Sequence, residues 1–182
     1  MLLCYGACFC RHRAPKVGLN GEVTFAIQDA HAKRVELSGQ FMDGLRSLTK
    51  GENDVWSVTV KIDKPDIYPY SFIVDGVQVA DPSNMLLFPN ERFKASLLEM
   101  PDSSALYTVN DVPHGKVSYC IYSSNVLGMN RPLLVYTPAG YEAGKKQYPV
   151  LYLVSGTTDT EETWFKVGRV NTILDNLIAQ GK

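Results

Sequence analysis

Cysteines and a histidine near the start of the chain are residues whose types could bind a metal. Cys4, Cys8 and Cys10 precede His12 in a C-x3-C-x-C-x-H run, while Cys120 stands alone. A run with this spacing is not a familiar zinc site. We therefore predict no bound metal and no cofactor, although the residue types alone would allow a metal.

The segment that carries these cysteines, Met1–Cys10, is typical of the end of a hydrophobic export segment. It lacks the basic start of a signal peptide, because Arg11, His12 and Arg13 follow the apolar residues instead of preceding them. A truncated or misassigned start is the alternative. We expect residues 1–16 to be a leader or truncated signal segment and the protein to be secreted or periplasmic. The role of the three cysteines stays open.

Aromatic side chains form the second group of candidate functional residues, because their rings can stack on the faces of sugars. The candidates for a carbohydrate-binding platform are Trp56, Tyr68 and Tyr70, with Phe72 beside them. All occupy alternating positions of predicted strands, where aromatic residues usually fill a core or pair across strands. We expect core packing, and a glycan platform is the alternative.

Composition limits the possible partners. The chain has 182 residues, of which 18 are basic and 19 acidic, so its formal net charge is −1. No basic field is present to attract nucleic acid or anionic lipid, and no apolar run is long enough to span a bilayer. We expect a folded protein that binds no nucleic acid and spans no membrane. The oligomeric state is unknown.

Residues 17–100 carry the pattern of an all-β domain. Apolar and polar residues alternate in four sets: Val23, Phe25 and Ile27; Val35 and Leu37; Trp56, Val58 and Val60; Tyr68, Tyr70, Phe72 and Val74. A period of two is typical of strands buried on one face. Asp75-Gly76 favours a hairpin turn before Val77–Ala80, and Leu97 and Leu98 indicate a last strand. These features predict an antiparallel sandwich.

The pattern changes after a predicted linker at residues 101–116. Ser118–Tyr122 and Arg131–Tyr136 predict two strands, and Pro149–Val154 predicts a third that is covered on both faces, as in the middle of a parallel sheet. A polar loop, Ser155–Thr160, precedes a helix with one apolar side. The residues of that side are Val170, Ile173, Leu174, Leu177 and Ile178.

Strand, loop and helix make half of a βαβ unit, and the returning parallel strand is absent from the sequence. The roughly 65 residues from Val117 onward are too few to bury enough surface by themselves. Either a longer chain was cut or a partner completes the sheet, and we favour the cut.

Both parts of the chain resemble one family, the bacterial carbohydrate esterases of family 1. These feruloyl and acetylxylan esterases are related to esterase D and enterochelin esterase. Residues 35–42 (VELSGQFM) and 55–60 (VWSVTV) resemble their N-terminal immunoglobulin-like E-set domain, which is similar to carbohydrate-binding modules of family 48. Residues 127–131 (LGMNR), 148–153 (YPVLYL) and 171–182 (NTILDNLIAQGK) resemble the opening of their esterase domain. The resemblance implies an immunoglobulin-like sandwich over 17–100 and the incomplete start of an α/β-hydrolase domain over 117–182.

The resemblance also implies hydrolysis of ester decorations on plant cell-wall polysaccharide by a serine nucleophile. That serine lies on a G-x-S-x-G elbow, with Asp and His later in the chain. No such elbow occurs here, and Gly44-Leu45-Arg46-Ser47-Leu48 lacks the second glycine. His12, His31 and His114 are expected to be plain solvent-facing residues. We expect the triad beyond Lys182 and no esterase activity from this chain alone.

One catalytic element is nevertheless implied by the resemblance, an oxyanion-hole donor in the loop after the third strand. The family has a His-Gly pair and small residues there, and this chain has Ser155-Gly156-Thr157-Thr158. Gly156 matches, and the Thr157 amide is the candidate donor to the developing charge on the carbonyl oxygen. The threonines replace glycines, which could alter the loop geometry. The alternative is a plain loop before a helix.

Two functions from other classes remain open. The chain could be a non-catalytic carbohydrate-binding module with a vestigial esterase tail, or it could be a spacer or docking domain.

Overall fold

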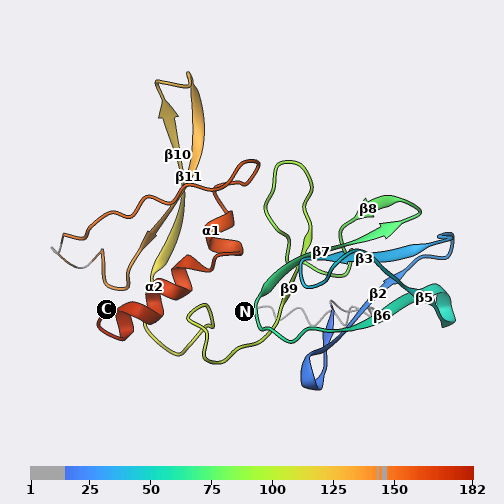
Figure 1. Cartoon of the computed structure of the whole chain (residues 1–182). Coiled ribbons are helices and arrows are strands. Elements are labelled where there is room, and N and C mark those ends of the chain that lie inside the picture. The colour runs from blue at the N-terminus through green and yellow to red at the C-terminus, as the bar shows by residue number, and fades with distance from the viewer. Residues whose placement is uncertain (1–14, 143, 145–146) are drawn as a thin grey trace, which may run out of the picture. The chain divides into compact units, whose positions relative to one another are not determined.

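The structure, a computed structural model shown in Figure 1, describes residues 15–142, 144 and 147–182. The expected leader, with Cys4, Cys8, Cys10 and His12, lies outside these residues apart from its last two positions. The regular structure of the described residues is mostly β-strand, with two short α-helices. The chain forms two compact units. The first unit consists of the chain up to Leu87 together with Ala95–Met100. The second consists of Phe88–Lys94 and Pro101–Lys182.

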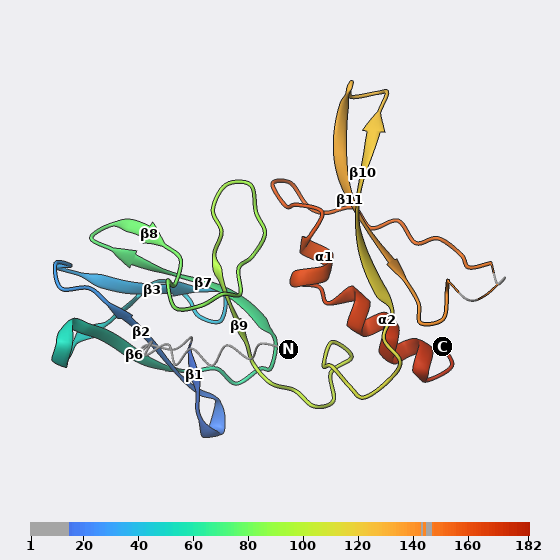
Figure 2. The same ribbon diagram turned by 180° about the vertical axis from the view of Figure 1, so that it is seen from behind.

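The described residues of the first unit form two antiparallel sheets, which Figure 2 shows from behind. In one sheet the order is β1 (Lys16–Val17), β2 (Glu22–Gln28), β6 (Val55–Lys61) and β5 (Thr49–Lys50). In the other it is β4 (Arg46–Ser47), β3 (Val35–Gly39), β7 (Ile67–Val74) and β8 (Val77–Val79), and β9 (Ser96–Glu99) also pairs with β7. Short 3-10 turns at Leu19–Gly21 and Glu52–Asp54 precede β2 and β6. The strands predicted from the period of two are confirmed.

One hydrophobic core joins these two sheets. Phe25 of β2 and Tyr70 of β7 are both almost completely buried, and their rings meet edge to face with centroids 5.0 Å apart. Along β2 every second side chain is buried, as the alternation in the sequence predicts. Each large apolar side chain buried in this way contributes about 1.5–3 kcal/mol to folding.

The hairpin turn predicted at Asp75-Gly76 is also confirmed. Both residues have positive φ, 48° and 88° respectively, which suits the tight turn between β7 and β8. The Asp75 carboxylate accepts hydrogen bonds from the N–H groups of Lys33 and Arg34, with Oδ1 at 3.0 and 2.8 Å. This side chain therefore fastens the turn to the start of β3.

A buried polar cluster follows β8. The Tyr70 hydroxyl donates to Asp81 Oδ2 at 2.6 Å, and Asn84 Nδ2 donates to the Tyr70 oxygen at 3.0 Å and to the Leu97 carbonyl at 2.8 Å. The Asp81 N–H donates to Ser96 Oγ at 2.8 Å. Burial and the Asp81 carboxylate raise the pKa of Tyr70 far above its ordinary value, so the phenol is a neutral donor. The cluster joins the chain before residue 85 to the chain after residue 95.

Among its described residues, the second unit contains one hairpin and two helices. Strands β10 (Lys116–Ser124) and β11 (Met129–Thr137) pair antiparallel along their whole length, and α1 (Thr163–Lys166) and α2 (Val170–Ala179) follow. The two strands and the helix predicted for this part of the sequence are confirmed. The predicted linker, 101–116, belongs to this unit and contains turns but no strand before Lys116.

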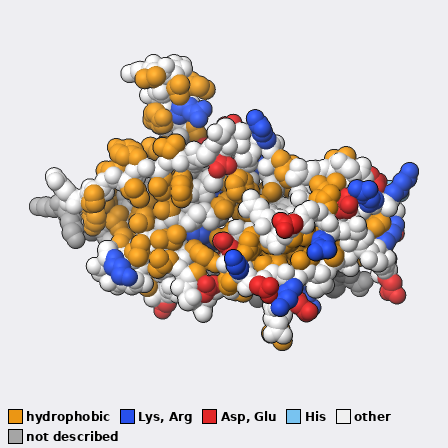
Figure 3. All heavy atoms as spheres, in the orientation of Figure 1, with side chains coloured by type: hydrophobic (Ala, Val, Ile, Leu, Met, Phe, Trp, Pro, Cys, Tyr) orange, Lys and Arg blue, Asp and Glu red, His pale blue; other side chains and the backbone are white. Residues whose placement is uncertain are grey.

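The third predicted strand, Pro149–Val154, is not a strand in this chain. The segment pairs with no strand of the described residues, and Val150, Tyr152 and Val154 expose 71, 85 and 86% of their surface. The prediction of a strand covered on both faces is wrong here because an apolar run favours burial but forms a strand only beside a neighbour. Figure 3 shows hydrophobic side chains gathered on the surface that the second unit forms.

Helix α2 does not bury the apolar side that its sequence predicts. Its buried side chains are the polar Thr172, Asp175 and Asn176, whereas the predicted apolar side is only partly covered and Ile178 is 47% exposed. The polar side of the helix therefore faces the rest of the second unit.

Candidate functional site

The loop Ser155–Thr160 contains the predicted oxyanion residues and connects the exposed apolar segment to α1. The Asp159 N–H donates to the Gly156 carbonyl at 3.1 Å, which closes a tight turn. Thr158, at the third position of this turn, has a φ of 72°. A β-branched residue rarely adopts that conformation. It costs about 1–3 kcal/mol and persists only where the surrounding contacts enforce it.

The predicted donor, Thr157, lies at the second position of the same turn. Gly156 and Thr157 are both exposed. Among the described residues, no hydrogen bond uses the Thr157 N–H. A backbone donor that is free and exposed can bind an acceptor from a ligand, so the geometry is compatible with the predicted oxyanion role.

The loop is held by residues 88–94, a segment for which the sequence predicts no role. The Glu91 N–H donates to the Thr158 carbonyl at 2.8 Å, and Asn90 Nδ2 donates to Thr158 Oγ1 at 3.0 Å and to Asp159 Oδ1 at 3.2 Å. The segment falls within the range 17–100 that the sequence pattern assigns to one domain. The structure groups it with the chain from residue 101 onward.

A shallow pocket of about 310 Å³ lies beside the loop. Its lining residues are Phe88, Ser155, Gly156, Asp159, Thr163, Trp164, Val167 and Gly168. Trp164 Nε1 donates to the Val154 carbonyl at 3.2 Å, which holds the indole ring. A Cβ atom on Gly168 would lie only 2.9 Å from the Trp164 carbonyl oxygen, so this position requires glycine. Phe88 and Trp164 give the pocket aromatic walls, and its lining includes Gly156 and Asp159, the first and last residues of the turn that contains Thr157.

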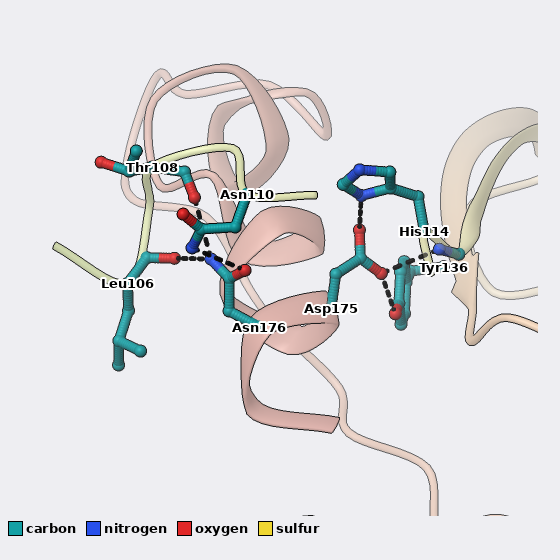
Figure 4. Close-up of polar contacts among 8 residues, drawn as sticks. Leu106, Thr108, Asn110, His114, Tyr136, Asp175 and Asn176 are labelled. Carbon is teal, nitrogen blue, oxygen red and sulfur yellow. Dashed lines mark hydrogen bonds and ion pairs between the residues drawn. The ribbon is translucent and has the colours of Figure 1, made fainter. Parts of the chain in front are cut away.

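Helix α2 and the chain around β10 meet at a buried carboxylate, Asp175, shown in Figure 4. Its Oδ1 accepts the Tyr136 hydroxyl at 2.6 Å and the Gly115 N–H at 2.8 Å, and its Oδ2 lies 2.9 Å from His114 Nδ1. Burial raises the pKa of Asp175, but the bonds from Tyr136, Gly115 and His114 outweigh burial, so its pKa is lowered overall. The pKa of Tyr136 is raised by burial and by this carboxylate.

The neighbouring residue, Asn176, fixes the segment that was predicted to be a linker. Its Nδ2 donates to the carbonyl groups of Leu106 and Thr108 at 2.7 and 2.9 Å, and its Oδ1 accepts from Asn110 Nδ2 at 3.0 Å. Figure 4 shows these bonds beside the Asp175 cluster. The two adjacent polar residues of α2 thus hold two separate stretches of chain.

The histidines are placed only partly as predicted. His31 is exposed, as expected of a solvent-facing residue, and His12 lies outside the described residues. His114 is different, because its ring pairs with Asp175 and its side chain is 48% exposed. His114 is therefore exposed to solvent as predicted, but it also pairs with a buried carboxylate, which the prediction did not include. A single sequence does not reveal a partner that lies 61 residues away.

The aromatic candidates for sugar binding lie mostly in the core. Trp56 is 8% exposed with its Nε1 bonded to the Asp29 carbonyl, and Tyr70 is 2% exposed. Neither offers a free ring face for stacking, so both pack in the core as expected. Tyr68 is partly buried against Phe41, with ring centroids 5.8 Å apart. Core packing is therefore confirmed for Trp56 and Tyr70, and the alternative of a glycan platform does not apply to them.

Two other kinds of feature, a metal centre and a membrane-spanning helix, do not occur in the described part of the chain. No group of three or more His, Cys, Asp or Glu side chains there is arranged to hold a metal ion. None of the helices there combines the length and apolar character that crossing a membrane needs.

Comparison with known proteins identifies relatives for both units. Residues 124–182 match the family model described as "Putative esterase". An endo-1,4-beta-xylanase/feruloyl esterase of Xylanibacter ruminicola is 32% identical over 177 residues, which are 92% of this chain and 24% of that protein. The chain thus spans about a quarter of the length of this curated relative.

A solved structure extends the comparison to the fold. The enterobactin esterase FES from Shigella flexneri superposes with a TM-score of 0.56 at 18% identity, over 94% of this chain and 52% of that one. At this identity the similarity concerns the fold alone. The matched family model and the xylanase/feruloyl esterase relative support an assignment to the esterase family, and the fold shared with an esterase agrees with it.

Proposed function

We propose that this chain supplies the N-terminal domain and the oxyanion loop of a serine esterase that removes feruloyl or acetyl groups from plant cell-wall polysaccharide. The observation that carries the proposal is the Thr157 N–H, which makes no hydrogen bond among the described residues and belongs to the turn whose Gly156 and Asp159 line an aromatic pocket. The name of the relative from Xylanibacter ruminicola, a xylanase/feruloyl esterase, supports the class of substrate. Because a polysaccharide is met outside the cell, the proposal includes export of the protein to the periplasm or medium.

The two units have different parts in this proposal. The two sheets of the first unit form an immunoglobulin-like sandwich, and β10, β11, residues 149–154 and α2 form the start of an α/β-hydrolase domain. The exposed run Val150–Val154 supports this assignment, because it is suited to a central strand that neighbours cover. The half-exposed apolar side of α2 would lie on the same sheet.

The proposed chemistry needs catalytic residues other than those at positions 1–182. These positions contain no G-x-S-x-G motif, so the serine nucleophile, the aspartate and the base histidine are expected elsewhere in the protein. In the reaction, attack on the ester carbonyl places negative charge on its oxygen. The Thr157 N–H would donate to that oxygen, and Phe88 and Trp164 would contact the ring of a feruloyl group.

The proposal is tested by removing one backbone donor. Proline at the second position of a tight turn keeps the backbone shape but has no N–H, and Thr157→Ala is the matched control that keeps it. In the complete protein that contains this chain, Thr157→Pro is expected to lower kcat on methyl ferulate by about a hundredfold or more, whereas Thr157→Ala is nearly neutral. A serine-directed inhibitor should abolish turnover.

Two outcomes would contradict the proposal. One is equal kcat for the proline variant and the alanine variant. The other is a complete protein that binds feruloylated arabinoxylan without hydrolysing it, which would favour the carbohydrate-binding alternative. Residues 1–182 alone are expected to give no turnover of methyl ferulate or p-nitrophenyl acetate.

A further inference from the structure

The segment Phe88–Lys94 leaves the first unit at a defined point and returns to it. The Leu97 N–H donates to the Leu86 carbonyl at 2.8 Å, and Leu87 pairs with Ser96. Between these residues the chain belongs to the second unit. Its two ends are therefore fixed close together, which lowers the entropic cost of placing the residues between them.

The side chain of Asn90 is the centre of this segment. Its Oδ1 accepts the Arg92 N–H at 2.9 Å, so the amide nitrogen must point the other way. That nitrogen donates to Thr158 Oγ1 and Asp159 Oδ1, and the backbones of Asn90 and Asp159 form an antiparallel bridge. The amide is thus fixed on both sides, by its own segment and by the turn after Gly156.

The two residues beside Asn90 reinforce this contact. Glu91 donates its N–H to the Thr158 carbonyl, so both the hydroxyl and the carbonyl of Thr158 are bound by the segment. The Pro89 carbonyl accepts the Thr163 hydroxyl at 3.2 Å, and Pro89 itself is buried. The segment therefore holds the loop at Thr158 and again at the start of α1.

This arrangement explains how a threonine occupies a conformation that favours glycine. Thr158 has a φ of 72°, and a non-glycine residue stays there only where its neighbours enforce it. The bonds to its hydroxyl and carbonyl provide that enforcement. Because Thr157 precedes Thr158, the direction of the Thr157 N–H depends on the same turn.

We propose that Asn90 is a positioning residue of the esterase, which holds the Gly156–Asp159 turn so that the Thr157 N–H faces the reacting carbonyl. The inference rests on the proposed function, because it concerns the oxyanion donor named there. Asn90 contacts the turn and not the substrate, so its effect on the reaction passes through Thr157.

The test uses the complete protein with methyl ferulate as substrate. Asn90→Ala is expected to lower kcat about tenfold while KM stays within twofold, because the donor acts on the transition state more than on the bound ester. Adding Thr158→Gly to this variant should restore most of the lost kcat, since glycine adopts the positive φ without help. Lys94→Ala, an exposed change in the same segment, is the matched control and should match the unsubstituted enzyme.

A role confined to stability gives a different result. In that case Asn90→Ala lowers the melting temperature, leaves kcat of the folded enzyme unchanged and is not rescued by Thr158→Gly. That outcome, or no effect of Asn90→Ala at all, would overturn the proposal.

A measurement that needs no catalytic activity separates failure of the positioning role from failure of the proposed function. In residues 1–182, hydrogen exchange of the Asp159 N–H, which bonds to Gly156, should become at least tenfold faster in Asn90→Ala and stay unchanged in Lys94→Ala. If the complete protein hydrolyses no ester but this exchange rises, the turn is held by Asn90 and the esterase role is lost. Unchanged exchange rejects the positioning role itself.

Discussion

In the first unit the most buried side chains are mainly apolar, whereas in the second they are mainly polar. Every hydrophobic residue of the shared core, such as Phe25 and Phe72, belongs to the first unit. Among the described residues of the second unit, the buried ones are Pro89, Thr172, Asp175 and Asn176. Large apolar residues of that unit, such as Val150 and Tyr152, are exposed.

This difference separates a closed domain from an open one. Two sheets that share a core form their backbone hydrogen bonds and bury their apolar side chains within this chain. In the second unit, hydrogen bonds from α2 set the arrangement of the elements, while the apolar surface remains available to a further layer. Polar contacts can thus position a hairpin, a loop and a helix before any hydrophobic core covers them.

The largest expected effect comes from deleting a core ring. Phe25→Ala should lower the free energy of unfolding of the first unit by about 3–5 kcal/mol, because it leaves a cavity among buried neighbours. The chain has two tryptophans, Trp56 in the first unit and Trp164 in the second. Labelling with 5-fluorotryptophan therefore gives one ¹⁹F resonance for each unit, and urea titration follows them separately.

The comparison predicts that only the Trp56 resonance responds to Phe25→Ala. Phe25→Leu is the graded control and should cost less, because it leaves a smaller cavity. If both resonances shift to the same lower urea midpoint, the units unfold as one, and the contrast between them has no energetic meaning.

A smaller effect is expected from the buried carboxylate of the second unit. Asp175→Ala leaves the Tyr136 hydroxyl and the Gly115 N–H without their acceptor, which should cost about 2 kcal/mol. The urea midpoint of the Trp164 resonance reports the loss. Asp111→Ala, at an exposed acidic residue of the same unit, should leave that midpoint unchanged. Equal midpoints for both variants would mean that the polar contacts contribute no stability.

The same carboxylate predicts a dependence on pH. Because its pKa is lowered below the ordinary value of 3.8, the folded state favours the charged form. This stabilisation is fully present above pH 3.8 and is lost as the pH falls through the lowered pKa, with a slope of up to about 1.4 kcal/mol per pH unit. The Trp164 resonance should show this loss, and Asp175→Asn should remove it. A slope that persists in Asp175→Asn would assign the acid sensitivity to other groups.

Local pattern predicts the first unit better than the second. The period of two placed β2, β3, β6 and β7, and Asp75-Gly76 placed a turn, because each depends on residues close in sequence. The Asn90–Thr158 and His114–Asp175 contacts join residues 68 and 61 positions apart, and neither has a local signature. Gly115, next to His114, is a weak signal of close packing at this place, because a Cβ atom there would collide with the Tyr136 ring.

The run Val150–Val154 shows why a correct preference for burial can lead to a wrong prediction of a strand. Its composition favours a buried strand, but the described residues provide no strand beside it. The oxyanion candidates were placed through resemblance to a family, and the structure supplies the free Thr157 N–H. Neither source indicated that residues 88–94 hold the loop, because that segment lies in the middle of a domain with a different pattern.

The smallest expected effect is that of Val150→Thr, which belongs to a comparison of one substitution made in both units. Val35→Thr places a hydroxyl in the core of the first unit, where Val35 is 1% exposed, and should cost about 1–3 kcal/mol. Val150→Thr makes the same change where the side chain is 71% exposed, and should stay within about 0.5 kcal/mol in this chain. The two ¹⁹F resonances measure both.

The second half of that experiment uses the complete protein. If the proposed hydrolase sheet covers residues 149–154 there, Val150→Thr should then cost about as much as Val35→Thr does in residues 1–182, because the hydroxyl loses its contact with water. A cost that stays near zero in the complete protein would mean that Val150 remains on the surface. The second unit would then keep its apolar surface open to solvent, and the assignment of this segment to a central strand would fail.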